Sequence, residues 1–352
     1  MILEQELRSS GASAPDLPKS NHGQEVEISR ATTQQETAFD RRAIPGGARE
    51  WLWHASDGHE IRVIDWAEPE GGASCGSILF MAGRGDAYEK YLETFEDWRA
   101  RGWRVGAADW RGQAGSGRLG MDRVTGHVDD FTLWIEDLAR FWAQWARGRQ
   151  GALVLAGHSM GGHLVLRAAA DAVLSPDPDA LILSAPMLDV LPEGVPLVLR
   201  RGLARIMCAV GDSRRQAWKW NEKPGVLPAA RKALLTHDEA RYADELWWRE
   251  KRPELVMGPG SWGWVAGALR SIRKLARPGM LERVRVPVFL FATRTDGLVG
   301  FRAIQRAAER LPDVETLYFG AEASHEILRE SDEVRGRALD AIDAFLNRVC
   351  GS

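Results

Sequence analysis

The sequence predicts an α/β protein: a mostly parallel central sheet, flanked by helices, with a helical cap inserted after the sixth strand. Short apolar runs alternate with amphipathic helical segments along most of the chain, as expected of parallel strands joined by crossover helices. This alternation stops between 187 and 277, where the sequence becomes helical and dense in Trp and Arg. We therefore expect one sheet-based core and one inserted helical unit.

The expected elements follow one another in a regular order. Two strand-like runs flank a turn-prone Ser-Asp-Gly and predict a hairpin at 50–54 and 60–66. The later strands are expected at 77–81, 105–108, 153–156, 181–183, 286–291 and 315–319. The helices of the core are expected at 88–101, 129–146, 163–172, 302–310 and 334–349.

The N-terminal segment differs from the rest in composition. It is rich in Ser, Gln, Glu and Gly and has no sustained hydrophobic period, so we expect a poorly ordered tail. The predicted organisation is a tail, a core in two parts and a helical cap, at 1–36, 37–186 with 278–352, and 187–277.

Composition excludes several classes of function. The 45% hydrophobic and 27% charged content is that of an ordinary globular protein, and a net charge of −3 gives no attraction to nucleic acid. The start of the chain lacks the features of a signal peptide, and no apolar run is long enough to span a bilayer. The 3 cysteines have no metal-ligand spacing. Cytoplasmic residence is expected, and no oligomeric state is predicted.

The sharpest motif is Gly-His-Ser-Met-Gly at 157–161, which follows a buried strand and precedes a helix. This is G-x-S-x-G in the context that it requires. The glycines are needed because a tight strand-to-helix turn leaves little room for side chains beside the serine. The motif predicts Ser159 as a nucleophile, held outward at the carboxyl edge of the sheet.

A serine hydroxyl needs a base to take its proton, and position in the chain selects His325 among the 8 histidines. His325 follows the last strand, on a loop at the carboxyl edge of the sheet. The acid that orients the base should follow a late strand between the serine and the histidine, which selects Asp296. Asp189, after the preceding core strand, is the competing acid.

Two backbone amides should stabilise the oxyanion. The amide of Met160 is expected to supply the first, and the amide of Arg84, on the Gly-rich loop after the third strand, the second. The Arg84 guanidinium either contacts an anionic substrate group or is simply paired or solvated. A second Gly-rich stretch at 109–117 lacks the lysine of a phosphate loop and is interpreted as structural.

With these residues identified, the chain resembles the monoacylglycerol lipase and lysophospholipase branch of the α/β-hydrolase fold, the serine aminopeptidase S33-like group. The resemblance runs from about Phe39 to the C-terminus. It rests on the elbow at 157–162, on the loop at 109–117, and on Asp296 and His325 in family order.

The lysophospholipase-like members resemble the chain most, through the segment 83–91 and the loop at 109–117. One position departs from the family pattern: where the family usually has His-Gly before the second oxyanion donor, this chain has Ala82-Gly83. With that difference the backbone amide can still serve as the donor.

The resemblance implies a serine hydrolase that cleaves acyl chains ester-linked to glycerol or glycerophosphate, without a cofactor or a metal. The substrate is then a small acyl ester or a lysolipid gripped under the cap. We expect Trp218, Trp262 and His158 to contact it. The tryptophans of the inserted segment are Trp218, Trp220, Trp247, Trp248, Trp262 and Trp264.

Within the cap, the stretch at 195–207 interleaves Leu and Val with Arg. This pattern is typical of a helix at a lipid interface, and equally of a cap helix whose arginines face water. The first interpretation adds peripheral contact with the inner face of a membrane to the cytoplasmic location.

The same machinery would serve a general carboxylesterase, a thioesterase, a lactonase or an aminopeptidase. Epoxide hydrolases and dehalogenases of this fold present Asp where Ser159 stands, so they are disfavoured. From a different class, a ligand sensor on a hydrolase scaffold remains an alternative, although such proteins generally lose one of the three catalytic residues that this chain retains.

Overall fold

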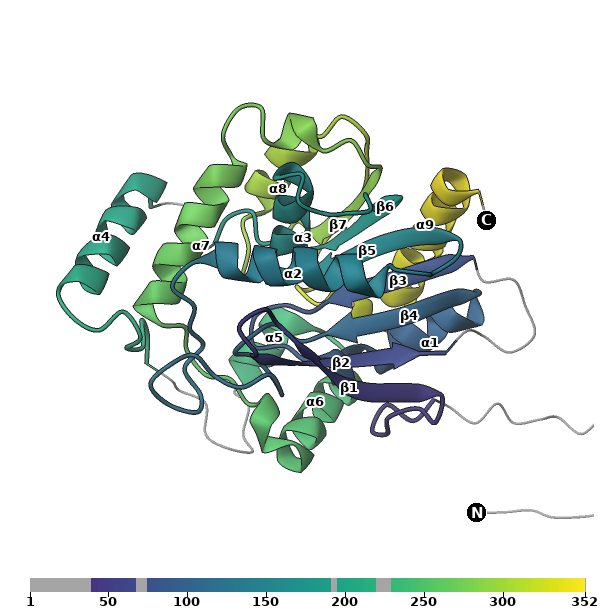
Figure 1. Cartoon of the computed structure of the whole chain (residues 1–352), viewed down its shortest axis with the longest axis horizontal. Helices are drawn as coiled ribbons and strands as arrows, with labels where there is room; N and C mark the ends of the chain where they lie inside the picture. The colour runs from purple at the N-terminus through teal and green to yellow at the C-terminus, as the bar shows by residue number, and fades with distance from the viewer. Residues whose placement is uncertain (1–38, 68–74, 191–194, 220–228, 352) are drawn as a thin grey trace, which may run out of the picture. The chain divides into compact units, whose positions relative to one another are not determined.

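The computed structural model describes residues 39–67, 75–190, 195–219 and 229–351. The predicted tail at 1–36 lies outside the described residues. Residues Phe39–Ser352 form one compact unit, whose strands make a single sheet in the order β1-β2-β4-β3-β5-β6-β7-β8 (Figure 1). The predicted α/β class is confirmed.

The sheet is antiparallel only at one edge. β1 (Ala48–His54) and β2 (Glu60–Trp66) form the predicted hairpin, and β2 also pairs antiparallel with β4 (Trp103–Ala108). All other neighbours are parallel. The remaining strands are β3 (Gly76–Met81), β5 (Ala152–His158), β6 (Ala180–Ser184), β7 (Val288–Thr293) and β8 (Val314–Phe319).

Helices cover both faces of the sheet, so its central strands are apolar throughout. In β3, Ile78 and Phe80 pack on one face while Leu79 and Met81 pack on the other, as the alternation of a strand requires. The first face is covered by α1 (Leu92–Ala100) and α9 (Asp332–Cys350). The second is covered by α2 (Phe131–Trp145), α3 (Met160–Ala170) and α8 (Phe301–Ala308).

The predicted helix at 88–101 begins as a 3₁₀ turn, Tyr88–Tyr91, before α1 continues it. The sequence pattern does not distinguish the two because both place side chains three apart on one face. This turn follows the loop after β3 directly, which brings its side chains close to the carboxyl edge of the sheet.

Between β6 and β7, where the sequence predicts an insertion, the described residues form four α-helices. They are α4 (Leu197–Ala209), α5 (Ala229–Leu235), α6 (Glu239–Lys251) and α7 (Trp262–Leu275). We call residues 187–277 the inserted segment. α7 packs against α2 and α3, whereas α4 packs on α7 on the side away from the sheet (Figure 1).

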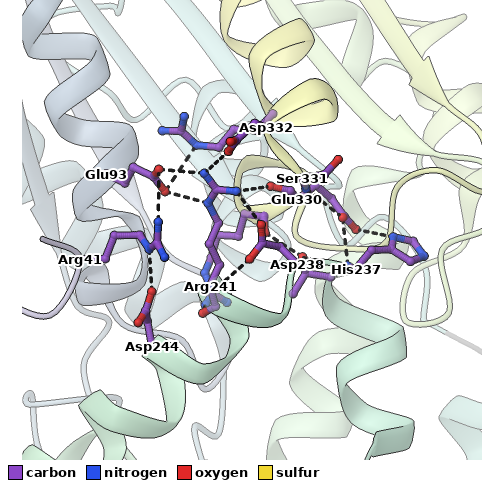
Figure 2. A network of polar contacts seen from close by, with 12 residues as sticks. Arg41, Glu93, His237, Asp238, Arg241, Asp244, Glu330, Ser331 and Asp332 are labelled. Atoms are coloured by element: carbon purple, nitrogen blue, oxygen red, sulfur yellow. Dashed lines mark hydrogen bonds and ion pairs between the residues drawn. The ribbon is translucent and has the colours of Figure 1, made fainter. Parts of the chain in front are cut away.

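The helix α6 is fastened to the core by ion pairs around Arg241 (Figure 2). The buried Arg241 guanidinium donates to Glu93 on α1 at 2.7 Å and to Asp332 at the start of α9 at 2.6 Å. Arg41 in turn bridges Asp244 of α6 and Glu93. This half of the inserted segment is therefore held against α1 and α9.

Candidate active site

The nucleophile elbow has the geometry that the motif predicts. Ser159 lies between β5 and α3 with φ 53° and ψ −117°, a backbone conformation that is strained for a residue with a side chain. Neighbouring glycines are required: a Cβ at Gly161 would lie 2.2 Å from the Met81 carbonyl oxygen, and one at Gly157 would lie 2.7 Å from the backbone of Gly161. The turn therefore presents the Ser159 side chain beyond the end of β5.

His325 and Asp296 meet at the carboxyl ends of β8 and β7. The His325 Nδ1 lies 2.7 Å from Asp296 Oδ2, and both side chains are almost completely buried. The second oxygen, Asp296 Oδ1, accepts the amides of Leu298 at 2.8 Å and Val299 at 3.0 Å. The carboxylate is thus fixed on both sides and directs its free lone pairs at the imidazole.

This contact alters the ionisation of both groups. Burial lowers the pKa of His325, but the charge and hydrogen bond of Asp296 outweigh burial and leave that pKa raised. Burial raises the pKa of Asp296, but the opposing effect of His325 and of the two amides leaves it lowered. Asp189, the competing acid, pairs instead with Arg200 at 3.0 Å.

Ser159 and His325 line the same cavity, which brings the nucleophile and the base together. Among the contacts of the described residues, the Ser159 hydroxyl has no hydrogen bond with the imidazole. Such hydrogen bonds are often loose in a free enzyme and shorten when substrate binds. Asp296 therefore orients the His325 imidazole before the Ser159 hydroxyl forms its hydrogen bond with it.

The loop after β3, residues 82–86, lies against the elbow and carries the expected second amide donor; we call it the oxyanion loop. A Cβ at Gly83 would lie 3.1 Å from His158 Cδ2 and 3.2 Å from the Ser159 Cβ, so a side chain there would crowd the elbow. The Gly85 amide donates to the side chain of Gln113 at 2.8 Å. Gln113 therefore links the stretch at 109–117 to the oxyanion loop. The sequence predicted a structural role for this stretch but not this contact.

The cavity beside Ser159 has a volume of about 850 Å³ and is walled mainly by the inserted segment. Its apolar lining includes Trp218, Trp262 and Trp264, so two of the expected substrate contacts lie there. Trp247 and Trp248 belong to α6 and pack with the hydrophobic cluster on the α1 and α9 face of the sheet, so neither lines the cavity. Trp220 lies outside the described residues. The cavity also has cationic side chains, namely Arg84, Lys90, Arg200, Lys219 and Arg231.

Arg84 and His158, two further predicted site residues, both line the cavity. The Arg84 guanidinium donates to the Gly258 carbonyl at 2.6 Å and lies 5.1 Å from the ring of Trp218 and 5.0 Å from that of Trp264. The His158 ring is 4.7 Å from that of His325. Burial, assisted by the charge of His325, lowers the pKa of His158 to about 3, so His158 is neutral at physiological pH.

A buried cluster of charges beside the base was missed by sequence reasoning. Asp86, Glu326 and His158 present ligand atoms within 4.8 Å of one another, a donor set that would suit a metal ion. The ammonium of Lys90 lies against both carboxylates, 2.9 Å from Asp86 and 2.5 Å from Glu326. A cation of the chain itself therefore neutralises them.

The strand order, together with a strained serine between β5 and α3, defines the class of α/β hydrolases. Solved structures agree with this fold. A soluble variant of monoglyceride lipase from Saccharomyces cerevisiae, in complex with a substrate analog, has a TM-score of 0.70 and 16% identity, with 89% of this chain and 98% of that chain covered. A carboxyl esterase from Bacillus coagulans in complex with glycerol has a TM-score of 0.66 and 15% identity, with coverage of 87% and 100%.

Sequence comparison narrows the class to a family. The family model described as serine aminopeptidase, S33 matches residues 72–332. The protein named lysophospholipase L2 of Escherichia coli (strain K12) is 31% identical over 290 residues, which cover 77% of this chain and 80% of that protein. The chain belongs to the serine aminopeptidase S33 family of α/β hydrolases.

Proposed function

We propose that the chain is a serine hydrolase of the lysophospholipase type that cleaves carboxylic esters of acyl lipids. The observation that carries this proposal is the strained Ser159 at the wall of an apolar cavity that is also lined by His325, whose imidazole is held by the buried Asp296. The similarity to a protein named lysophospholipase L2 supports the lipid substrate.

The reaction follows from the roles of these groups. His325 accepts the hydroxyl proton as the Ser159 oxygen attacks the ester carbonyl, and the amides of Met160 and Arg84 donate to the oxyanion. The tetrahedral intermediate collapses, the C–O bond to the alcohol breaks, and His325 returns the proton to that alcohol. Water, deprotonated by His325, then releases the fatty acid from the acyl-enzyme.

The lining of the cavity favours a lysophospholipid over a monoacylglycerol. Its tryptophans offer apolar surface for an acyl chain. Lys90, Arg200 and Arg231 in the lining form ion pairs with carboxylates of the chain. Two further cations of the lining, Arg84 and Lys219, lie near Trp218 and would complement a phosphate-bearing head group. The inserted segment, as the wall of this cavity, would act as the cap that selects the substrate.

Two measurements test the assignment. Fluorophosphonate labelling of the wild type, lost in Ser159→Ala, distinguishes an enzyme from a ligand sensor. Hydrolysis of a lysophospholipid and a monoacylglycerol with the same acyl chain then isolates the contribution of the phosphate. Activity confined to short water-miscible esters would contradict the lipid substrate, and equal labelling of both proteins would contradict the nucleophile.

We also propose that the protein resides in the cytoplasm and contacts the inner face of a membrane through α4. None of the described helices combines the length and the apolar character needed to cross a bilayer. However, α4 exposes large apolar side chains, with Val198 74% and Leu199 62% exposed. Arg201 on the same helix lies in the field of four further arginines, Arg205, Arg270, Arg273 and Arg277.

Apolar side chains beside arginines favour an anionic lipid surface. Co-sedimentation with vesicles should therefore increase when phosphatidylglycerol is added to phosphatidylcholine, and should decrease in Val198→Asp. Binding that is equal for neutral and anionic vesicles would contradict the role of the arginines. Unchanged binding of Val198→Asp would contradict the role of α4.

A further inference from the structure

The loop that carries His325 is bound to the inserted segment through its backbone. We call residues 323–330 the base loop. The His325 amide donates to the Leu234 carbonyl at 3.2 Å, and the Glu326 amide donates to the Leu235 carbonyl at 2.8 Å. These carbonyls belong to the last turn of α5, where a helix has no backbone donors of its own to satisfy them. The base loop therefore takes its position from the inserted segment as well as from the sheet.

The ammonium of Lys90 connects the base loop to two other parts of the fold. Its Nζ lies 2.9 Å from Asp86, 3.1 Å from Glu245 and 2.5 Å from Glu326, and these side chains are at most 6% exposed. The ammonium donates a hydrogen bond to Glu326 and forms ion pairs with Asp86 and Glu245. Asp86 belongs to the oxyanion loop, Glu245 belongs to α6, and Glu326 directly follows His325.

These groups are charged in the folded protein. Burial lowers the pKa of Lys90, but the three carboxylates outweigh burial and leave it raised. Burial raises the pKa of Glu326, but Lys90 and Arg329 outweigh burial and leave it lowered. The pKa of Glu245 is lowered in the same way, chiefly by Lys90 against the effect of burial. Arg329 also pairs with both Glu245 and Glu326, so the cluster compensates its buried carboxylates with more than one cation.

Asp86 transmits the position of Lys90 to the oxyanion loop. Its Oδ2 accepts the hydroxyl of Tyr91 at 2.6 Å and, at 3.4 Å, the amide of Gly83, which precedes the expected donor Arg84. Glu326 holds the base loop to Lys90 in the same way that Asp86 holds the oxyanion loop. The two loops that must cooperate on one carbonyl group are thus joined through a single cation.

We propose that Lys90 is a positioning residue for acyl transfer, whose ammonium fixes the oxyanion loop and the base loop relative to each other and to α6. The inference rests on the proposed function, which assigns the chemistry to these loops. Lys90 acts through Asp86 and Glu326 and has no bond of its own to form or break. Its replacement should slow the attack of Ser159 while leaving substrate affinity nearly unchanged.

The test compares three variants at a temperature at which thermal unfolding shows all of them folded. Lys90→Met removes the ammonium. Glu245→Gln weakens the contact of Lys90 with α6, together with the ion pairs that Glu245 makes with Arg231, Arg249 and Arg329. Arg335→Met is the matched control, because it removes a buried cation that pairs with Asp97 and Glu93 on α1 and makes no hydrogen bond or ion pair with the described residues of either loop. The readouts are the rate of labelling of Ser159 by a fluorophosphonate, and kcat and KM for a soluble ester.

We expect labelling and kcat to fall about 10- to 100-fold in Lys90→Met, since misplacement by about 1 Å costs that much. Glu245→Gln should show a smaller loss, and Arg335→Met should stay within about twofold of the wild type. In each case KM should change little. A purely structural role would lower the melting temperature and leave the rates of the folded variants intact.

The pH profile gives a second readout. His325 is faced by Asp296 after β7, Asp86 after β3, Glu326 on its own loop and His158 at the end of β5. Without the Lys90 charge, Arg329 is the remaining cation paired with Glu326, so the carboxylates of Asp86 and Glu326 act more strongly on the imidazole. The acid limb of the labelling rate should therefore move to higher pH in Lys90→Met.

The outcomes separate the inference from the proposed function. Folded Lys90→Met and Glu245→Gln proteins that are labelled at the wild-type rate, with an unmoved acid limb, would overturn the role of Lys90. If Lys90→Met does not fold, Glu245→Gln decides alone: slower labelling at an unchanged melting temperature supports the proposal, and the wild-type rate refutes it. Absence of Ser159 labelling in the wild type would instead refute the proposed function.

Discussion

Replacement of Asp296 by Asn tests whether this carboxylate orients the His325 imidazole. The Asp296 Oδ1 accepts two backbone amides, so an Asn there must keep its carbonyl oxygen at that position. Its NH₂ group then faces His325 Nδ1, which lies 2.7 Å from the present Oδ2. Because NH₂ can only donate, Nδ1 must become the acceptor, and the imidazole proton moves to Nε2. An Nε2 that carries a proton cannot accept the one on Ser159.

The expected loss in kcat is roughly 10⁴-fold, the cost of the wrong tautomer in a Ser-His-Asp site. At 1.36 kcal/mol per factor of ten, this corresponds to about 5.4 kcal/mol of transition-state stabilisation. Steady-state hydrolysis of a soluble ester measures it, with thermal unfolding as the check that the variant is folded.

Asp189→Asn is the matched control, because Asp189 is the competing acid and pairs with Arg200. It should retain activity within about threefold of the wild type. If Asp296→Asn kept more than a tenth of the wild-type kcat, or if Asp189→Asn lost as much as Asp296→Asn, the assignment of the orienting acid would be wrong.

Three further predictions concern pH, the elbow and the attachment of α6. The base must be neutral to act and its pKa is raised above the ordinary 6.5, so the acid limb of kcat/KM should lie above pH 6.5, as a profile from pH 5 to 9 would measure. Gly161→Ala should give little folded protein, because its Cβ would lie 2.2 Å from the Met81 carbonyl; a soluble variant with wild-type melting would contradict the elbow geometry. Arg241→Met should lower the free energy of unfolding by about 1 to 3 kcal/mol, since it removes a buried cation whose hydrogen bonds to Glu93 and to the Glu330 carbonyl hold α6 against the core; denaturant titration measures this, and a loss below about 0.5 kcal/mol would refute the attachment.

The elements that sequence reasoning placed correctly share a local signal. The apolar run of β3 and the glycines around Ser159 constrain the backbone within a few residues, so their pattern can be interpreted without tertiary information. The partnership of His325 with Asp296 was predicted across a wider gap, because parallel strands bring their carboxyl ends to one edge of the sheet.

The Lys90 cluster shows where that reasoning ends. Asp86 and Lys90 lie four residues apart, whereas Glu245 and Glu326 come from two other segments, and each alone looks like a charged residue on a solvated surface. Their burial follows from the packing of α6 against the core, which no periodicity along the chain encodes. The Tyr-Glu-Lys-Tyr turn was predicted as the start of a helix because a 3₁₀ turn and an α-helix both place side chains three apart on one face.

The outer position of α4 separates two tasks that many enzymes combine in one element. In this helix, all of whose residues are described, only Ala204 is buried, and the helix packs on α7 whereas the base loop is bound to α5. Leu203 of α4 nevertheless lines the cavity. Grafting other sequences into 197–209 is therefore a route to new head-group or acyl preferences in which the proton-transfer apparatus stays untouched, so selectivity and turnover can be diversified independently.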